Sequence, residues 1–98
     1  MIFCETHVFH TQVEFDDLDA GGVVHHPKYL HFLERARTRA MNDAGCSYAD
    51  SMKAGVAFVI AEVRAKYLRP LRYEEKITVL TRCVAIRRSS LKVFQAIV

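Results

Sequence analysis

Apolar and polar residues alternate along four stretches of the chain, and this period of two predicts β-strands. The four stretches cover residues 7–15, 57–68, 76–86 and 91–98. In the first of them, Phe9, Thr11 and Val13 share a face, which predicts a half-buried strand. Pro70 cannot donate to a strand ladder, so it is expected to end the second strand.

One stretch between the first two strands has the helical period instead. Pro27 suits a first helical position, because its missing N–H would have no partner there and its φ is already helical. Gly45 suits a left-handed C-terminal cap. The residues that recur between them at helical spacing are Tyr29, Leu33, Ala36, Ala40 and Ala44. A strand, a long helix and an antiparallel meander predict an α+β fold with one helix packed on one sheet.

The length and the last residues bear on domain organisation. The chain has 98 residues, 51% of them hydrophobic, and it has no repeat or linker, so a single domain over 1–98 is expected. A chain this short buries little surface, which favours association with a second copy. Val98 stands inside an apolar strand, which leaves two expectations: another chain covers that edge, or the sequence is a truncated product.

Charge and cysteine content bear on the partners and the cellular compartment of the protein, but not on its chemistry. The formal net charge is +3 and the basic residues are scattered, so no nucleic-acid partner is expected. The three cysteines form no paired motif, which favours a reducing cytoplasm. The start does not resemble a signal peptide. No apolar run reaches the roughly 20 residues that would span a bilayer.

Candidate chemistry is concentrated in residues 15–29, FDDLDAGGVVHHPKY. The glycine pair permits a tight backbone and the close approach of a ligand. The helix that follows directs unsatisfied N–H groups, with a partial positive charge, back into this loop. The loop can therefore bring a carboxylate, as base or nucleophile, next to an oxyanion site, which is the pairing that acyl transfer requires.

The longer run FDDLDAGGVVHHPKYLHFLERAR resembles the signature of hotdog-fold thioesterases of the 4-hydroxybenzoyl-CoA thioesterase type, in particular the Tol–Pal-associated branch. The match continues through the YLRP turn and the RRSS hairpin. It implies a hotdog fold, in which an antiparallel sheet wraps one long central helix, here lacking the usual final strand. It also implies hydrolysis of acyl-CoA to free acid and coenzyme A without a cofactor. The implied assembly is a homodimer or a dimer of dimers, with the site at the subunit boundary.

The resemblance also implies roles for single residues. Asp19 matches the catalytic carboxylate, which attacks the thioester or activates water. The backbone N–H of His26 matches the donor that polarises the thioester carbonyl, and its side chain is expected to orient the substrate. The expected acyl contacts are Gly22, Val23, Tyr29, Phe58 and Val59. The residues matched to the coenzyme A phosphates are Arg87, Arg88 and Ser90.

Plainer interpretations stay open beside these roles. Asp19 suits a turn cap, and Asp16 and Asp17 are either solvated acids or supports for Asp19. His25 is expected at the surface. Glu34, on the helix, is expected to be structural or supporting.

Alternative functions also stay open. The arginines at 87 and 88 suit a polar hairpin as well as a phosphate site. A non-catalytic acyl-CoA-binding module on the same fold is the second candidate function. A hotdog dehydratase would need a different motif. A metal site is disfavoured, because adjacent residues seldom point at one ion; its ligands would be Asp16, Asp17, Asp19, His25 and His26.

Overall fold

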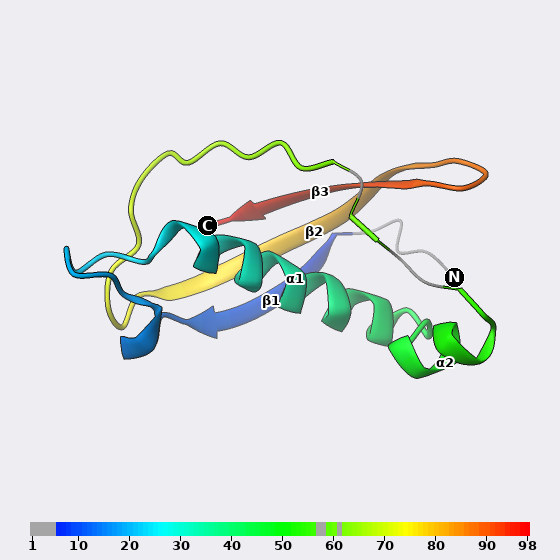
Figure 1. The fold of residues 1–98 in the computed structure, drawn as a ribbon, viewed down its shortest axis with the longest axis horizontal. Helices are drawn as coiled ribbons and strands as arrows, with labels where there is room; N and C mark the ends of the chain where they lie inside the picture. Colours follow the sequence, from blue (N-terminus) through cyan, green and yellow to red (C-terminus); the bar gives the residue numbers. More distant parts are fainter. Residues whose placement is uncertain (1–5, 57–58, 61) are drawn as a thin grey trace.

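Three antiparallel strands form the sheet on which the rest of the structure lies (Figure 1). The structure, a computed structural model, describes residues 6–56, 59–60 and 62–98. The strands, in their spatial order, are β1 (His7–Gln12), β2 (Lys76–Ile86) and β3 (Leu91–Ile97). Phe9 lies opposite Val79 in the first pair, and Thr81 lies opposite Gln95 in the second. The strands expected at 7–15, 76–86 and 91–98 are confirmed, although the first ends at Gln12.

The helix α1 (His26–Asp43) crosses one face of this sheet, and the core lies between them (Figure 1). The expected helix is confirmed, and Gly45 has the left-handed φ of +84° that was expected of its cap. Ala36 and Ala40 are fully buried, since side chains this small allow the helix to approach the strands closely. The other buried apolar residues of the core are Val13, Val24, Tyr29, Phe32, Leu71, Ile77 and Val79.

Polar contacts at two levels of α1, its C-terminal end and its middle, fix the helix to the sheet. At the C-terminal end of the helix, Nε2 of His7 in β1 lies 2.8 Å from Oδ2 of Asp43. Near the middle of the helix, Nε2 of Gln95 in β3 donates to the backbone carbonyl of Leu33 at 2.9 Å. Gln95 therefore bonds to a helical carbonyl from the edge of the sheet, which restrains both the position and the rotation of α1.

Two short helices were not expected from the sequence. A 3₁₀ turn, η1 (Phe15–Asp17), replaces the end of the first expected strand, and Phe15 is consequently exposed. Helix α2 (Tyr48–Lys53) begins at Ser47, whose hydroxyl accepts a hydrogen bond from the N–H of Asp50 at 3.2 Å. The Ser-x-x-Asp spacing is a recognised helix-start signal, so it could have indicated α2. Within the described residues, neither α1 nor α2 is long and apolar enough to cross a membrane.

The strand expected over 57–68 is wrong for the residues described there. Residues 59–60 and 62–68 have no strand conformation, and every one of them is exposed. Val59 and Leu68, on opposite faces of the expected strand, are 84% and 82% exposed. Alternation produces a strand only where a neighbouring strand completes its ladder, and in the described sheet the ladders are those of β1 with β2 and of β2 with β3. The segment runs past the sheet without joining it (Figure 1).

Candidate functional site

The loop between η1 and α1 is a tight turn centred on the glycine pair. An isolated bridge joins Leu18 to Val24, and the N–H of Asp19 donates to the carbonyl of Val23 at 2.9 Å. The N–H of Gly22 donates back to the carbonyl of Asp19 at 3.1 Å. Gly22 has a φ of +80°, a value that residues with a Cβ adopt only at a cost. The sequence Asp-Ala-Gly-Gly is therefore folded back on itself directly before the helix.

Asp19 lies exposed at this turn and also helps to form it. Its Oδ1 accepts a hydrogen bond from the N–H of Gly21 at 2.8 Å, which is an Asx turn. One carboxylate oxygen of Asp19 thus caps the turn, as the plainer interpretation of this residue expected. Its Oδ2 makes no hydrogen bond or ion pair with the described residues. Asp19 therefore presents one uncommitted, charged oxygen to solvent, while the other fixes the orientation of the carboxylate.

The neighbouring acids have different environments. Asp16 is exposed, whereas Asp17 is buried. Oδ2 of Asp17 accepts from the N–H of Glu14 at 2.8 Å, and its Oδ1 lies 3.8 Å from Nζ of Lys28. The carbonyl of Asp17 accepts from the N–H of His25 at 2.9 Å. Asp17 therefore joins η1 to the start of α1 and supports the loop that carries the next acid.

The first turn of α1 presents one backbone donor beside this loop that has no partner among the described residues. His25 is the N-cap residue, but its side chain makes no capping hydrogen bond. His26 is the first helical residue, and its N–H donates to no acceptor among the described residues. Pro27 has no N–H, so the donor at His26 stands apart from the others of the first turn. Both histidines are exposed, as expected of His25.

The side chain of His26 lies against two tyrosines. Its ring stacks on that of Tyr67, with ring centres 5.1 Å apart and planes inclined by 15°. The ring of Tyr67 in turn meets the ring of Tyr29 edge to face at 5.2 Å. The hydroxyl of Tyr29, a buried residue, accepts a hydrogen bond from the N–H of Leu71 at 3.0 Å. Sequence reasoning missed Tyr67 as a neighbour of the helix start, because it assigned this residue to a strand.

The described residues that are expected to contact the acyl group differ in their environments. Tyr29 belongs to the core of the chain, and Gly22 is exposed in the turn. Val23 is half-buried and forms an isolated bridge with Arg72. Val59 is exposed, and Phe58 lies outside the described residues. The acyl-contact role of these residues stays a prediction.

The residues expected to bind the coenzyme A phosphates lie in the hairpin between β2 and β3. The N–H of Arg87 donates to the carbonyl of Ser90 at 2.8 Å. Arg87 and Arg88 are both exposed. Figure 1 shows this hairpin at the opposite end of the long axis from the loop that precedes α1. The molecule is 43 Å long in that direction. Within one chain, Asp19 and Arg88 are therefore far apart.

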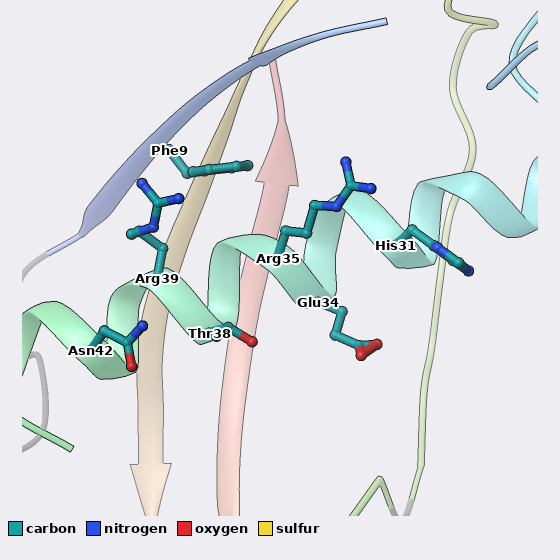
Figure 2. A pocket seen from close by; sticks show the side chains of 7 residues that line it. All are labelled: Phe9, His31, Glu34, Arg35, Thr38, Arg39 and Asn42. Atoms are coloured by element: carbon teal, nitrogen blue, oxygen red, sulfur yellow. The ribbon is translucent and has the colours of Figure 1, made fainter. Parts of the chain in front are cut away.

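A solvent-open hollow of about 390 Å³ lies along α1, beside Phe9 of β1. Figure 2 shows Arg35 and Arg39 projecting to one side of the helix and Glu34 to the other. The guanidinium of Arg39 lies over the ring of Phe9, 5.4 Å from its centre. The residues that line the hollow are Phe9, His31, Glu34, Arg35, Thr38, Arg39 and Asn42. Glu34 thus faces this hollow, whose lining includes neither Asp19 nor His26.

A metal-binding arrangement does not form among the described residues. In that part of the chain, no three histidine, cysteine, aspartate or glutamate side chains converge as ligands of one ion would. The buried position of Asp17 and the Asx turn of Asp19 separate the acids that the sequence places together.

A family model and a sequence relative both relate this chain to thioesterases. The model of the thioesterase-like superfamily matches residues 13–98. The acyl-CoA thioester hydrolase YbgC of Escherichia coli O157:H7 is 37% identical over 87 residues, which are 89% of this chain and 65% of that protein. The chain therefore spans just under two thirds of the length of this relative.

Solved structures resemble the fold closely. A probable thioesterase from Bartonella henselae superposes with a TM-score of 0.89 at 28% identity, covering 96% of this chain and 79% of that one. The hypothetical protein TT1821 from Thermus thermophilus has a TM-score of 0.90 at 29% identity, with 95% of this chain and 71% of that one covered. The expected α+β architecture of the hotdog type is thereby confirmed.

Proposed function

Because the chain belongs to the thioesterase-like superfamily, we propose that the protein hydrolyses acyl-CoA thioesters to the free acid and coenzyme A. The observation that carries this proposal is the turn before α1, where one carboxylate oxygen of Asp19 and the backbone N–H of His26 both lack a hydrogen-bond partner among the described residues. The similarity to YbgC supports it, since that relative is named as an acyl-CoA thioester hydrolase.

The chemistry assigns one role to each of these groups. The N–H of His26 donates to the thioester oxygen, where negative charge develops as the carbonyl carbon becomes tetrahedral. The α1 N-terminus adds its partial positive charge at the same place. Asp19 either attacks the carbonyl carbon or removes a proton from the attacking water. As a base, Asp19 takes a proton from water, the water oxygen forms the new C–O bond, the C–S bond breaks, and the proton passes to the leaving sulfur. As a nucleophile, Asp19 forms an anhydride with the acyl group as the C–S bond breaks; water then hydrolyses the anhydride to the free acid and Asp19, and a proton of that water goes to the coenzyme A thiolate.

Substrate binding in this proposal needs two chains. The acyl group contacts Gly22, Val23, Tyr29, Phe58 and Val59, whereas Arg87, Arg88 and Ser90 bind the phosphates of coenzyme A. Since the loop and the hairpin lie at opposite ends of one chain, a second copy in the reverse direction would place its hairpin near this loop. We therefore propose a homodimer or a dimer of dimers, with the site at the boundary. A mass from light scattering that corresponds only to a monomer at assay concentrations would contradict this arrangement.

The decisive experiment replaces Asp19 with asparagine. Asparagine keeps an oxygen that can accept from the N–H of Gly21, so the Asx turn is retained and only the charge is lost. Hydrolysis of a panel of short, long and aromatic acyl-CoA esters should fall by about 100-fold or more. Asp16→Asn is the matched control, because Asp16 is an exposed acid in η1, directly before this loop, and it should keep the parental rate. Equal rates for Asp19→Asn and the parent would refute the catalytic role.

One observation favours the second candidate, a non-catalytic acyl-CoA-binding module. Asp19 uses one oxygen for its turn, and it does not line the hollow along α1. A binding module would bind acyl-CoA without hydrolysing it, and Asp19→Asn would leave the affinity unchanged. Calorimetric titration beside the hydrolysis assay distinguishes the two functions.

A further inference from the structure

The three aromatic rings at the start of α1 form a connected cluster. The His26 and Tyr67 rings are stacked, the Tyr67 and Tyr29 rings meet edge to face, and the His26 and Tyr29 rings are 6.2 Å apart with planes inclined by 60°. These separations and angles fall within the favourable range for aromatic pairs. The cluster therefore has a defined geometry, although two of its three members lie at the surface.

Among the described residues, only aromatic rings contact and orient the imidazole of His26. Its side chain makes no hydrogen bond or ion pair with the described residues. An exposed histidine without such a partner would rotate freely about its side-chain bonds. The stacked ring of Tyr67 covers one face of the imidazole, which excludes the rotamers that would turn this face to solvent.

Tyr67 is itself held from the core. Its partner Tyr29 is only 7% exposed and accepts a hydrogen bond from the N–H of Leu71, which is 4% exposed. The carbonyl of Leu71 accepts from the N–H of Val24, at the end of the loop that carries the candidate catalytic aspartate. Tyr67 otherwise belongs to a segment whose described residues are exposed and form no ladder. The aromatic cluster is thus the place where this segment is attached to the helix start.

We propose that Tyr67 is a positioning residue for His26. Its ring holds the imidazole beside the backbone N–H of the same residue, so that side chain and donor face the substrate together. The proposal rests on the proposed function for its consequence in catalysis, but its geometry is testable without any substrate. Tyr67 acts through His26 and needs no contact with the reacting atoms.

Proton NMR tests the geometry directly. Stacking on Tyr67 should move the ring protons of His26 upfield of those of His31, an exposed histidine of the same helix with no aromatic partner among the described residues. Tyr67→Phe should preserve this displacement, and Tyr67→Leu should abolish it. Tyr73→Leu is the matched control, since Tyr73 is a half-exposed tyrosine that meets the ring of Phe15 instead. It should leave the His26 signals in place.

The unsubstituted protein provides a second measurement if Tyr67→Leu fails to fold. Nuclear Overhauser contacts between the rings of His26 and Tyr67 should then be observed. Their absence, or unchanged His26 signals in a folded Tyr67→Leu variant, would overturn the proposal.

Kinetics distinguishes positioning from a general structural role. Tyr67→Leu should lower kcat about threefold to tenfold, the size expected for the loss of one aromatic pair, and Tyr67→Phe should restore it. In a His26→Ala background, Tyr67→Leu should have no further effect, because the ring that it positions is gone. Equal losses in both backgrounds would overturn the proposal. If no variant hydrolyses any ester, the proposed function fails, while the NMR measurements still decide whether Tyr67 orients His26.

Discussion

The side chain of Gln95 supplies the sharpest test of how α1 is held on the sheet. Its Nε2 donates to the carbonyl of Leu33 and to Oγ1 of Thr81, both at 2.9 Å, and its Oε1 accepts from a guanidinium nitrogen of Arg37 at 2.9 Å. The orientation of the amide follows from these partners, because arginine only donates and a carbonyl only accepts. Gln95→Met keeps most of the volume and removes all three hydrogen bonds.

The expected loss in unfolding free energy for Gln95→Met is about 2–4 kcal/mol. Each neutral hydrogen bond contributes about 1 kcal/mol, and the bond to a charged group about 1.5–3 kcal/mol, partly offset by the apolar replacement. Thr81 is 0% exposed, so its hydroxyl loses a partner that water cannot replace. Adding Thr81→Val should therefore recover about 1 kcal/mol or more, since a matched apolar pair leaves no orphaned polar atom.

Urea unfolding of the parent, the two single variants and the double variant measures both effects in one cycle. The reasoning is refuted if Gln95→Met unfolds at the parental midpoint. It is equally refuted if the double variant is less stable than the sum of the single effects, because the coupling would then have the wrong sign.

Three further predictions concern the loops. The pKa of Glu75 is lowered from its ordinary value of 4.5, chiefly by a hydrogen bond from the N–H of Arg72 and then by the guanidinium of Arg69. The ionised Glu75 carboxylate therefore stabilises the fold above pH 4.5, and this stabilisation is lost as the pH falls through the lower pKa of the folded state. Unfolding curves of the parent and Glu75→Gln should consequently differ at neutral pH and converge in acid; a constant difference would contradict this. Gly22→Ala should lower the unfolding free energy by about 1–2 kcal/mol in urea, because an alanine is strained at a φ of +80°. Asp17→Ala should cost about 1–3 kcal/mol in the same assay, since it removes a buried, charged hydrogen-bond acceptor; parental stability would show that the carboxylate does not support the loop.

The repeating parts of the fold could be predicted from the sequence, because a periodic pattern reports which face of an element is buried. The stripe that includes Ala36 and Ala40 and the cap at Gly45 both indicated α1 correctly. The same reasoning failed for residues 59–60 and 62–68, where the alternation is present but no described strand pairs with it. Alternation reports what a strand would look like, whereas the ladder depends on a neighbour elsewhere in the chain or assembly.

The candidate site was predictable only as far as local geometry determines it. The tight turn before α1 followed from its glycines and from the proline in the first helical turn. The different environments of Asp16 and Asp17 did not, because adjacent acids look alike until the 3₁₀ turn directs one of them inward. The contact between Tyr67 and His26 joins residues 41 positions apart, and no local pattern reports it.

Three of the contacts that hold α1 in place limit how a protein of this fold can change its preference for one acyl group over another. Tyr29 near the first turn, Leu33 in the middle and Asp43 at the last turn each bond to a different strand or loop. Sliding the helix by even one residue would break all three contacts at once, so α1 is held at both ends and in the middle. A change in the size of the acyl group that fits therefore has to come from substitutions of individual side chains or from rearrangement of the segment before Pro70, whose described residues form no strand. The position of α1 on the sheet would stay the same.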